Sequence, residues 1–355
     1  MTGFEYGNTR LRSWRSRLLD GGGYGRLILA ESIDQVLGAL SDTPYADDVA
    51  VAVARVSGPQ RLDEALRLNL AGTLRRMRSF YEGKPGAMVQ LLLDRWDLHN
   101  LRTMLRLPEG PAVPEDLAAL LVPAGRIDET AIRELVALPD VLSRIDLLVS
   151  WDIPSPDAAR RLLRIRPAIR AGGDGSVLEH TLDEVFASRL AEVLGDEPGG
   201  AAAVLRARLD AANLLTALRL RGARLAAEPV PDEQQALFLP GGAITGHLWL
   251  QVAAGDDREA AAAVITARRL LPGWAEAVAH WVDSGDLATL ARELQAATAR
   301  AGTALFVDGD PLGFDIPVAF TFAKEMEMRN LRLIGRAVTH GLPAAEVAEL
   351  LEVAA

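Results

Sequence analysis

The sequence predicts an all-α protein built from three similar helical units. Apolar residues recur at three- and four-residue spacing in the Ala-, Leu- and Arg-rich segments 201–222 and 319–338, the pattern of an amphipathic helix. No segment alternates β-branched and polar residues convincingly, as a half-buried strand would. A chain of 355 residues also exceeds what one hydrophobic core usually serves, so two or three domains are expected.

A repeated ten-residue pattern favours three domains over two. Its form is acid-x-x-Asn-Leu-x-x-x-x-Arg. It reads DLHNLRTMLR at 97–106, DAANLLTALR at 210–219 and EMRNLRLIGR at 327–336. The copies lie about 115 residues apart, and regular spacing of this kind indicates an internal repeat. We therefore expect units at residues 1–119, 120–236 and 237–355.

A second marker repeats in phase with the first. PAGRI at 123–127 and PGGAI at 240–244 each follow a copy of the pattern, and each is predicted to be a loop that opens the next unit. Other Gly- and Pro-rich stretches predict breaks between helices, among them GGGYG at 21–25, EGKPG at 82–86 and DGDPLG at 308–313.

Helical geometry places the acid and the asparagine of each copy on one face. Successive residues turn by about 100°, so Asp97 and Asn100 fall within an apolar stripe while Arg106 lies on the opposite side. Polar groups on a buried face need partners, so we expect them to bond backbone groups of a neighbouring helix or loop. The predicted structural staples are Asp97, Asn100, Asp210, Asn213, Glu327 and Asn330. A polar contact for a partner threaded between the units is the alternative interpretation.

Arginines are the candidate partner contacts. Arg106, Arg219 and Arg336 close the three copies of the pattern on the outward side, where they contact a partner or are merely solvated. A second group lies in residues 158–173, without an acid between Asp157 and Asp174: Arg160, Arg161, Arg164, Arg166 and Arg170. Such a group suits an acidic partner or anionic lipid headgroups, and a solvated helix face is the other interpretation.

Composition excludes several classes of protein. A net charge of −10 argues against binding nucleic acid, because phosphate backbones require an excess of basic residues. The absence of cysteine excludes disulfides and thiol catalysis and favours a reducing compartment. The N-terminus has no signal-peptide pattern, and the longest uncharged run, 234–255, is broken by Pro240-Gly241-Gly242, so we expect a cytoplasmic chain without a transmembrane segment.

No motif indicates a catalytic, cofactor or metal site. The five histidines lack the spacing of metal ligands, and DGDPLG departs from a calcium loop at Pro311. The glycine-rich segments lack the Lys-Ser/Thr of a phosphate-binding loop. The residues therefore predict no cofactor or metal site, and by themselves they neither argue for an enzyme nor exclude one.

Several segments together resemble one known family. YGNTRLRSWRSRLLD at 6–20, LLLDRWDLHNLRTMLR at 91–106, ANLLTALRL at 212–220 and above all residues 310–351 are similar to the C subunit of V/A-type ATP synthases and ATPases, called the d subunit in eukaryotic vacuolar enzymes. The similarity runs nearly end to end. Gly335 departs from the pattern, since the other copies have Leu105 and Leu218 there.

The resemblance implies a non-catalytic rotor part of the central stalk. It implies three helical lobes around a pseudo-threefold axis, forming a funnel that receives the central axle and rests on the membrane proteolipid ring, on the cytoplasmic face of the membrane. The function would be to transmit torque for proton or sodium transport. Two alternatives remain open: a free-standing helical scaffold that binds an unrelated partner, and an all-α enzyme with a site in a central cavity.

Overall fold

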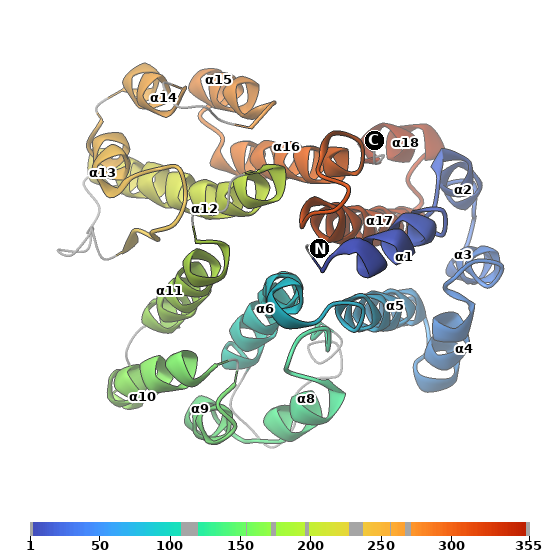
Figure 1. Ribbon diagram of the computed structural model, residues 1–355. Helices are drawn as coiled ribbons and strands as arrows, with labels where there is room; N and C mark the ends of the chain where they lie inside the picture. Colours follow the sequence, from blue (N-terminus) through green and yellow to red (C-terminus); the bar gives the residue numbers. More distant parts are fainter. Residues whose placement is uncertain are drawn as a thin grey trace. The chain divides into compact units, whose positions relative to one another are not determined.

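A computed structural model describes residues 3–107, 120–153, 155–171, 175–195, 199–226, 237–255, 257–266 and 271–352. All regular secondary structure in these ranges is helical, which confirms the predicted fold class (Figure 1). By the contacts among its residues the chain divides into two compact units, one of residues 1–182 and 310–355 and one of residues 183–309. The division into three units stays a prediction.

The first unit contains the helices of both ends of the chain. Its helices are α1 (Glu5–Arg15), α2 (Gly21–Leu27), α3 (Ile33–Leu40), α4 (Ala46–Arg55), α5 (Gln60–Arg78), α6 (Gly83–Leu105), α8 (Glu129–Val136), α9 (Val141–Ser150), α10 (Pro156–Arg170), α17 (Asp315–His340) and α18 (Ala344–Leu350). Helix α11 (Gly175–Leu194) begins in this unit and ends in the second.

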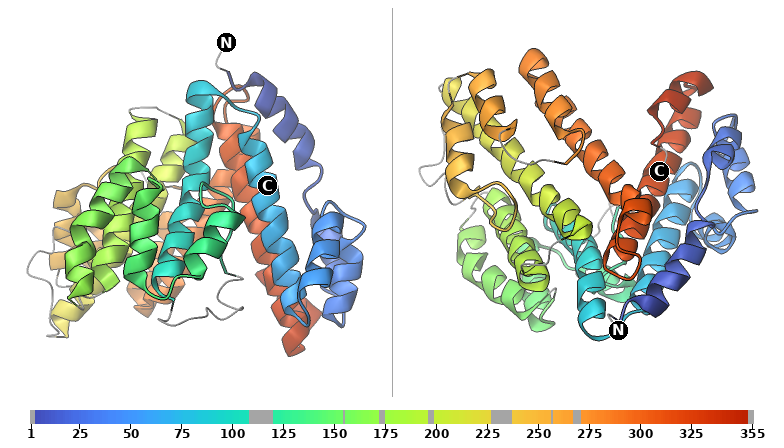
Figure 2. Two further views of the ribbon diagram at one scale, coloured as in Figure 1. Left: turned by 90° about the horizontal axis from the view of Figure 1, so that it is seen from below. Right: turned by 45° about the horizontal axis from the view of Figure 1, so that its top comes forward.

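Helix α17 is the central element of the first unit. It contacts α1, α3, α5, α6 and α18, and α1 and α5 lie beside it (Figures 1 and 2). Every residue from Asp315 to Met328 is buried, because neighbouring helices surround this part of α17. Gly335 is also buried, and a Cβ there would come within 2.4 Å of Leu62 Cδ2 on α5, which explains why this copy of the pattern has glycine.

A second group of helices in the first unit packs around the C-terminal half of α6. Its core combines Leu101 and Met104 with apolar residues of α8, α9, α10 and the start of α11. Arg144 of α9 is fully buried there and donates hydrogen bonds to the carbonyl oxygens of Met104, Leu135 and Leu138. The guanidinium thus satisfies backbone groups at helix ends that would otherwise lack partners.

The second unit packs its helices around three tryptophans. After the end of α11 it contains α12 (Gly200–Leu225), α13 (Gly246–Ala254), α14 (Arg258–Thr266), α15 (Trp274–Ser284) and α16 (Leu287–Asp308). The core includes Trp249, Trp274 and Trp281. The first two have hydrogen-bond partners for their indole N–H groups, namely Asn213 O and Thr298 Oγ1.

One predicted break is wrong. The glycine-rich stretch 21–25 forms most of α2 rather than a loop. Asp20 explains the difference, because its side chain accepts a hydrogen bond from the Gly23 N–H and so caps the helix. The cap offsets part of the conformational entropy that consecutive glycines lose on forming a helix.

Candidate functional site

The first copy of the repeated pattern ties α6 to the loop at 122–127. Asp97 accepts backbone hydrogen bonds from Arg126 and Ile127, both at 2.9 Å. Asn100 donates to the carbonyl oxygen of Val122 and accepts from its N–H, both at 2.7 Å. Both side chains are fully buried, so the two residues satisfy a loop that would otherwise bury unpaired backbone groups.

The second copy has the same arrangement on α12. Asp210 accepts from the N–H groups of Ala243 and Ile244 at 2.9 and 2.8 Å. Asn213 exchanges two hydrogen bonds with Leu239, at 2.7 and 2.9 Å. In both copies the acid therefore contacts the last two residues of the PAGRI or PGGAI segment, and the asparagine contacts the residue just before it.

The two loops need glycine where the carboxylate approaches. A Cβ on Gly125 would lie 2.2 Å from Asp97 Oδ1, and a Cβ on Gly242 would lie 2.0 Å from Asp210 Oδ1. Any larger residue would force the carboxylate away from the backbone N–H groups it accepts from. The repeated glycine is thus a consequence of the repeated acid.

The third copy joins α17 to both ends of the chain. Asn330 exchanges hydrogen bonds with the backbone of Glu352, 22 residues further on, as Asn100 does with Val122 at the same separation. Glu327 Oε2, however, accepts from the N–H of Leu19 at 2.6 Å. The segment equivalent to the PAGRI loop is therefore contributed in part by the N-terminus.

Helix caps support this equivalence. The residue after each backbone donor caps a helix: Asp128 follows Ile127, Thr245 follows Ile244, and Asp20 follows Leu19. The short helices α2, α8 and α13 thus begin at corresponding places. The sequence analysis did not predict the roles of Leu19 and Asp20. The sequence signal for them is Asp20 as a helix-capping residue, but the glycine-rich segment that follows it does not read as a helix.

The third copy also contains a buried ion pair. Glu327 Oε1 accepts from Tyr45 Oη at 2.6 Å and from Lys324 Nζ at 2.5 Å. Lys324 Nζ also donates to Tyr45 Oη at 2.9 Å. Burial and the neighbouring Glu327 raise the pKa of Tyr45 well above its ordinary value, so the phenol keeps its proton as a donor.

Burial raises the pKa of both aspartates. It raises the pKa of Asp97 to about 7, because the desolvation of the carboxylate outweighs the two backbone hydrogen bonds. The pKa of Asp210 is also raised by burial, while hydrogen bonds from Ile244 and Ala243 and the charge of Arg206 act against that rise. Asp97 has a nearby acid, Asp94, which raises its pKa further.

The three outward arginines all lie on the surface. Arg106, Arg219 and Arg336 are exposed, and Arg106 pairs with Glu179 at 2.6 Å. The structure therefore separates the buried acid and asparagine of each copy from its exposed arginine, as the helical geometry requires.

The arginines of α10 are partly engaged within the chain. Arg160 and Arg161 pair with Asp157, and Arg166 makes a two-pronged ion pair with Asp146. Arg164 and Arg170 are exposed and make no ion pair with the residues described. These two are the members of the group best placed to contact a partner.

A metal centre and a membrane span are both absent from the described residues. Within them, no group of three or more His, Asp or Glu residues could hold a metal ion. None of the described helices is long and apolar enough to cross a membrane. The repeated acid and asparagine fix long helices to loops, so the geometry defines an all-α protein whose long helices are tied to loops by buried polar side chains.

Comparison with known proteins gives the family. The profile of the ATP synthase (C/AC39) subunit family matches residues 7–350, so the chain belongs to that family, whose members are non-catalytic subunits of rotary ATP synthases. The chain is 28% identical over 344 residues to the C subunit of the V-type ATP synthase of Deinococcus radiodurans, covering 97% of this chain and 90% of that protein.

Archaeal relatives are similar over as much of the chain. The C subunit of the A-type ATP synthase of Halorubrum lacusprofundi is 27% identical over 363 residues, covering 97% of this chain and 95% of that protein. The corresponding protein of Thermococcus onnurineus is 25% identical over 361 residues, covering 99% of this chain and 90% of that protein.

Proposed function

We propose that this chain is the central-stalk rotor subunit of a V/A-type ATP synthase or ATPase. It acts as a socket that couples the central axle to the membrane proteolipid ring and transmits torque for ion transport. The chain works on the cytoplasmic face of the membrane. The single observation that carries the proposal is the near full-length match to a family of rotary ATP synthase subunits.

The staples supply the stiffness that such a part needs. Each copy of the pattern binds a long helix to a loop through buried hydrogen bonds, and Lys324 and Glu327 further tie α17 to Tyr45. Three copies of one such connection suit three lobes with a common construction, at 1–119, 120–236 and 237–355. With these bounds, each acid would bond the beginning of the next lobe, and Glu327 would join the third lobe to the first through Leu19.

Exposed arginines are the proposed contacts with partner subunits. Arg106, Arg219 and Arg336 occupy equivalent places on the three repeated helices, and Arg164 and Arg170 add positive charge on α10. Exposed positive charge on a chain of net charge −10 favours contact with acidic partner surfaces. A stable interface with each partner would bury about 800 Å² on this chain.

Cross-linking in the assembled complex tests the proposal. A photoreactive residue placed at Arg164 or Arg170 should cross-link to an axle subunit or to the proteolipid ring in isolated membranes. The control variant has the photoreactive residue in place of Arg300, which is an exposed residue of α16. Cross-links only to proteins outside the rotary complex would contradict the proposal and favour a free scaffold.

A further inference from the structure

The asparagines of the chain point to a binding pocket. All five are buried, and Asn8, Asn100, Asn213 and Asn330 each donate through Nδ2 and accept through Oδ1. Asn69 differs. Its Nδ2 donates to Pro44 O and Asp48 Oδ2, but its buried Oδ1 has no donor within the described part of the chain.

The orientation of this amide is fixed by its neighbours. Pro44 O and Asp48 Oδ2 lie at 3.1 and 2.8 Å and are both acceptors here, so only the NH₂ side of the amide can face them. Oδ1 must therefore face the other way. A buried acceptor without a donor has lost its hydrogen bonds to water, so a ligand that donates to it would recover part of that free energy.

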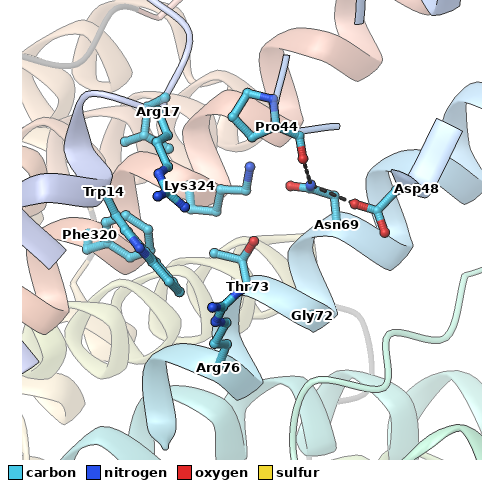
Figure 3. A pocket seen from close by; sticks show the side chains of 11 residues that line it. Trp14, Arg17, Pro44, Asp48, Asn69, Gly72, Thr73, Arg76, Phe320 and Lys324 are labelled. Atoms are coloured by element: carbon cyan, nitrogen blue, oxygen red, sulfur yellow. Dashed lines mark hydrogen bonds between the residues drawn. The ribbon is translucent and has the colours of Figure 1, made fainter. Parts of the chain in front are cut away.

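A pocket lies on that side of Asn69. It has a volume of about 310 Å³ and is lined by residues of α1, α5 and α17 together with Arg17, Leu18, Pro44 and Asp48. Figure 3 shows Asn69 Oδ1 and the Lys324 side chain directed into the same space, with Thr73 and Arg76 beside it and Trp14 on the facing wall. The volume is at the lower end of the range for small-molecule sites, about 300–1,000 Å³.

The pocket has an excess of positive charge. Arg17 and Arg76 are exposed at its rim, and their guanidinium carbons lie 5.8 and 5.6 Å from the centre of the Trp14 ring. Neither makes an ion pair with the residues described. Lys324 uses two donors of its ammonium group on Tyr45 and Glu327, which leaves a third. The one acidic side chain in the lining, Asp48, already accepts from Asn69.

We propose that this pocket binds a phosphorylated small molecule that also carries hydroxyl or amino groups, such as a sugar phosphate or a nucleotide. The phosphate lies between Arg17 and Arg76, because guanidinium groups match phosphate oxygens in charge and geometry. A hydroxyl or amino group of the ligand donates to Asn69 Oδ1. Trp14 and Phe320 supply the apolar wall for a sugar or base. The proposal is independent of the rotor function.

Gly72 allows the pocket to be blocked without removing any charge. It lines the pocket within α5, and a Cβ there would meet no atom within 4 Å. A larger side chain at this helical position should fill the pocket while leaving the fold intact. Gly38 of α3 is the matched control, since it is likewise a helical glycine with open space around it and does not line the pocket.

Calorimetric titration of the full-length protein at low ionic strength tests the proposal with three probes: AMP, ribose 5-phosphate and inorganic phosphate. AMP or ribose 5-phosphate should bind to the wild-type protein and to Gly38→Leu. Gly72→Leu and the double variant Arg17→Ala/Arg76→Ala should each weaken this binding by about tenfold or more. Circular dichroism and thermal unfolding establish that each variant is folded.

The outcomes are distinct. Inorganic phosphate should bind more weakly than ribose 5-phosphate, because it cannot reach both the arginines and Asn69 Oδ1. No binding of either organic phosphate, or equal binding by Gly72→Leu and the wild-type protein, would overturn the proposal. Inorganic phosphate binding as tightly as the organic phosphates would overturn the part assigned to Asn69.

Discussion

The N–H of Leu19 donates to Glu327 Oε2 across 308 residues of sequence, so the N-terminal segment completes the hydrogen bonding of a helix near the C-terminus. In the other two copies the corresponding acid is satisfied by a loop 29 to 34 residues further along. Together with the packing of α17 against α1 and α5, it joins residues 310–355 to the N-terminus in one compact unit. The hydrogen bonding of Glu327 on α17 thus depends on the segment that precedes α2.

Removing one partner of the buried Lys324–Glu327 pair should destabilise the fold more than removing both. Glu327→Leu leaves the Lys324 ammonium buried beside Tyr45 alone, and we expect a loss of about 3–5 kcal/mol in the free energy of unfolding. Lys324→Met/Glu327→Leu should recover much of that loss, because no buried charge remains. Urea denaturation of Glu327→Leu, Lys324→Met and the double variant measures the coupling, and additive losses would contradict it.

The asparagine staples should contribute to stability rather than to partner binding. Asn100→Leu and Asn213→Leu each remove both hydrogen bonds to one buried loop residue, so each should cost about 1–3 kcal/mol. Thermal unfolding and co-purification with the axle subunits measure the two effects separately. A variant that keeps its stability but no longer retains the axle would show that this face is an interface.

Gly125 should be coupled energetically to Asp97. Gly125→Ala places a Cβ 2.2 Å from Asp97 Oδ1 and should therefore destabilise the protein by displacing the carboxylate from Arg126 and Ile127. In an Asp97→Ser background, where the side chain at position 97 is shorter, Gly125→Ala should lower the free energy of unfolding by less than it does in the wild-type protein. Chemical denaturation of the double-mutant cycle measures this, and a cost that is the same in both backgrounds contradicts the close approach.

Asp97 should make stability depend on pH. Its pKa is about 7 in the folded chain, whereas an aspartate in the unfolded chain has a pKa of about 3.9. Between these values the folded state binds more protons, so the contribution of Asp97 is greatest at low pH and falls as pH rises through 7, by up to about 1.4 kcal/mol per pH unit.

Comparison with Asp97→Asn isolates this effect, because the other titrating groups are common to both proteins. The free energy of unfolding of the wild type relative to the variant should decrease between about pH 5 and about pH 8. Urea denaturation at several pH values measures the difference. A difference that stays constant or increases over this interval would contradict the raised pKa.

The sequence was sufficient to predict the fold class and the faces of the repeated helices. Apolar spacing and the 100° turn of a helix place Asp210 and Asn213 on the buried side and Arg219 outside, because these are local properties of one helix. Gly242 of PGGAI is explained by the close approach of the Asp210 carboxylate. The spacing of residues in the sequence does not predict that contact.

The partners of Glu327 could not be predicted in the same way. Leu19 lies at the other end of the chain, and its segment lacks the glycine-containing marker that precedes α8 and α13. The GGGYG stretch further concealed α2, since glycine-rich sequence normally indicates a break. Asn69 was likewise missed, because nothing in the sequence shows that one oxygen of its amide faces a pocket.

The most direct test of the rotor proposal is the composition of the complex retained by this chain. Affinity purification of the tagged full-length protein from gently solubilised membranes should recover the central axle subunits together with the proteolipid ring, as quantified by mass spectrometry. Recovery of neither would contradict the proposal that this chain couples the axle to the ring.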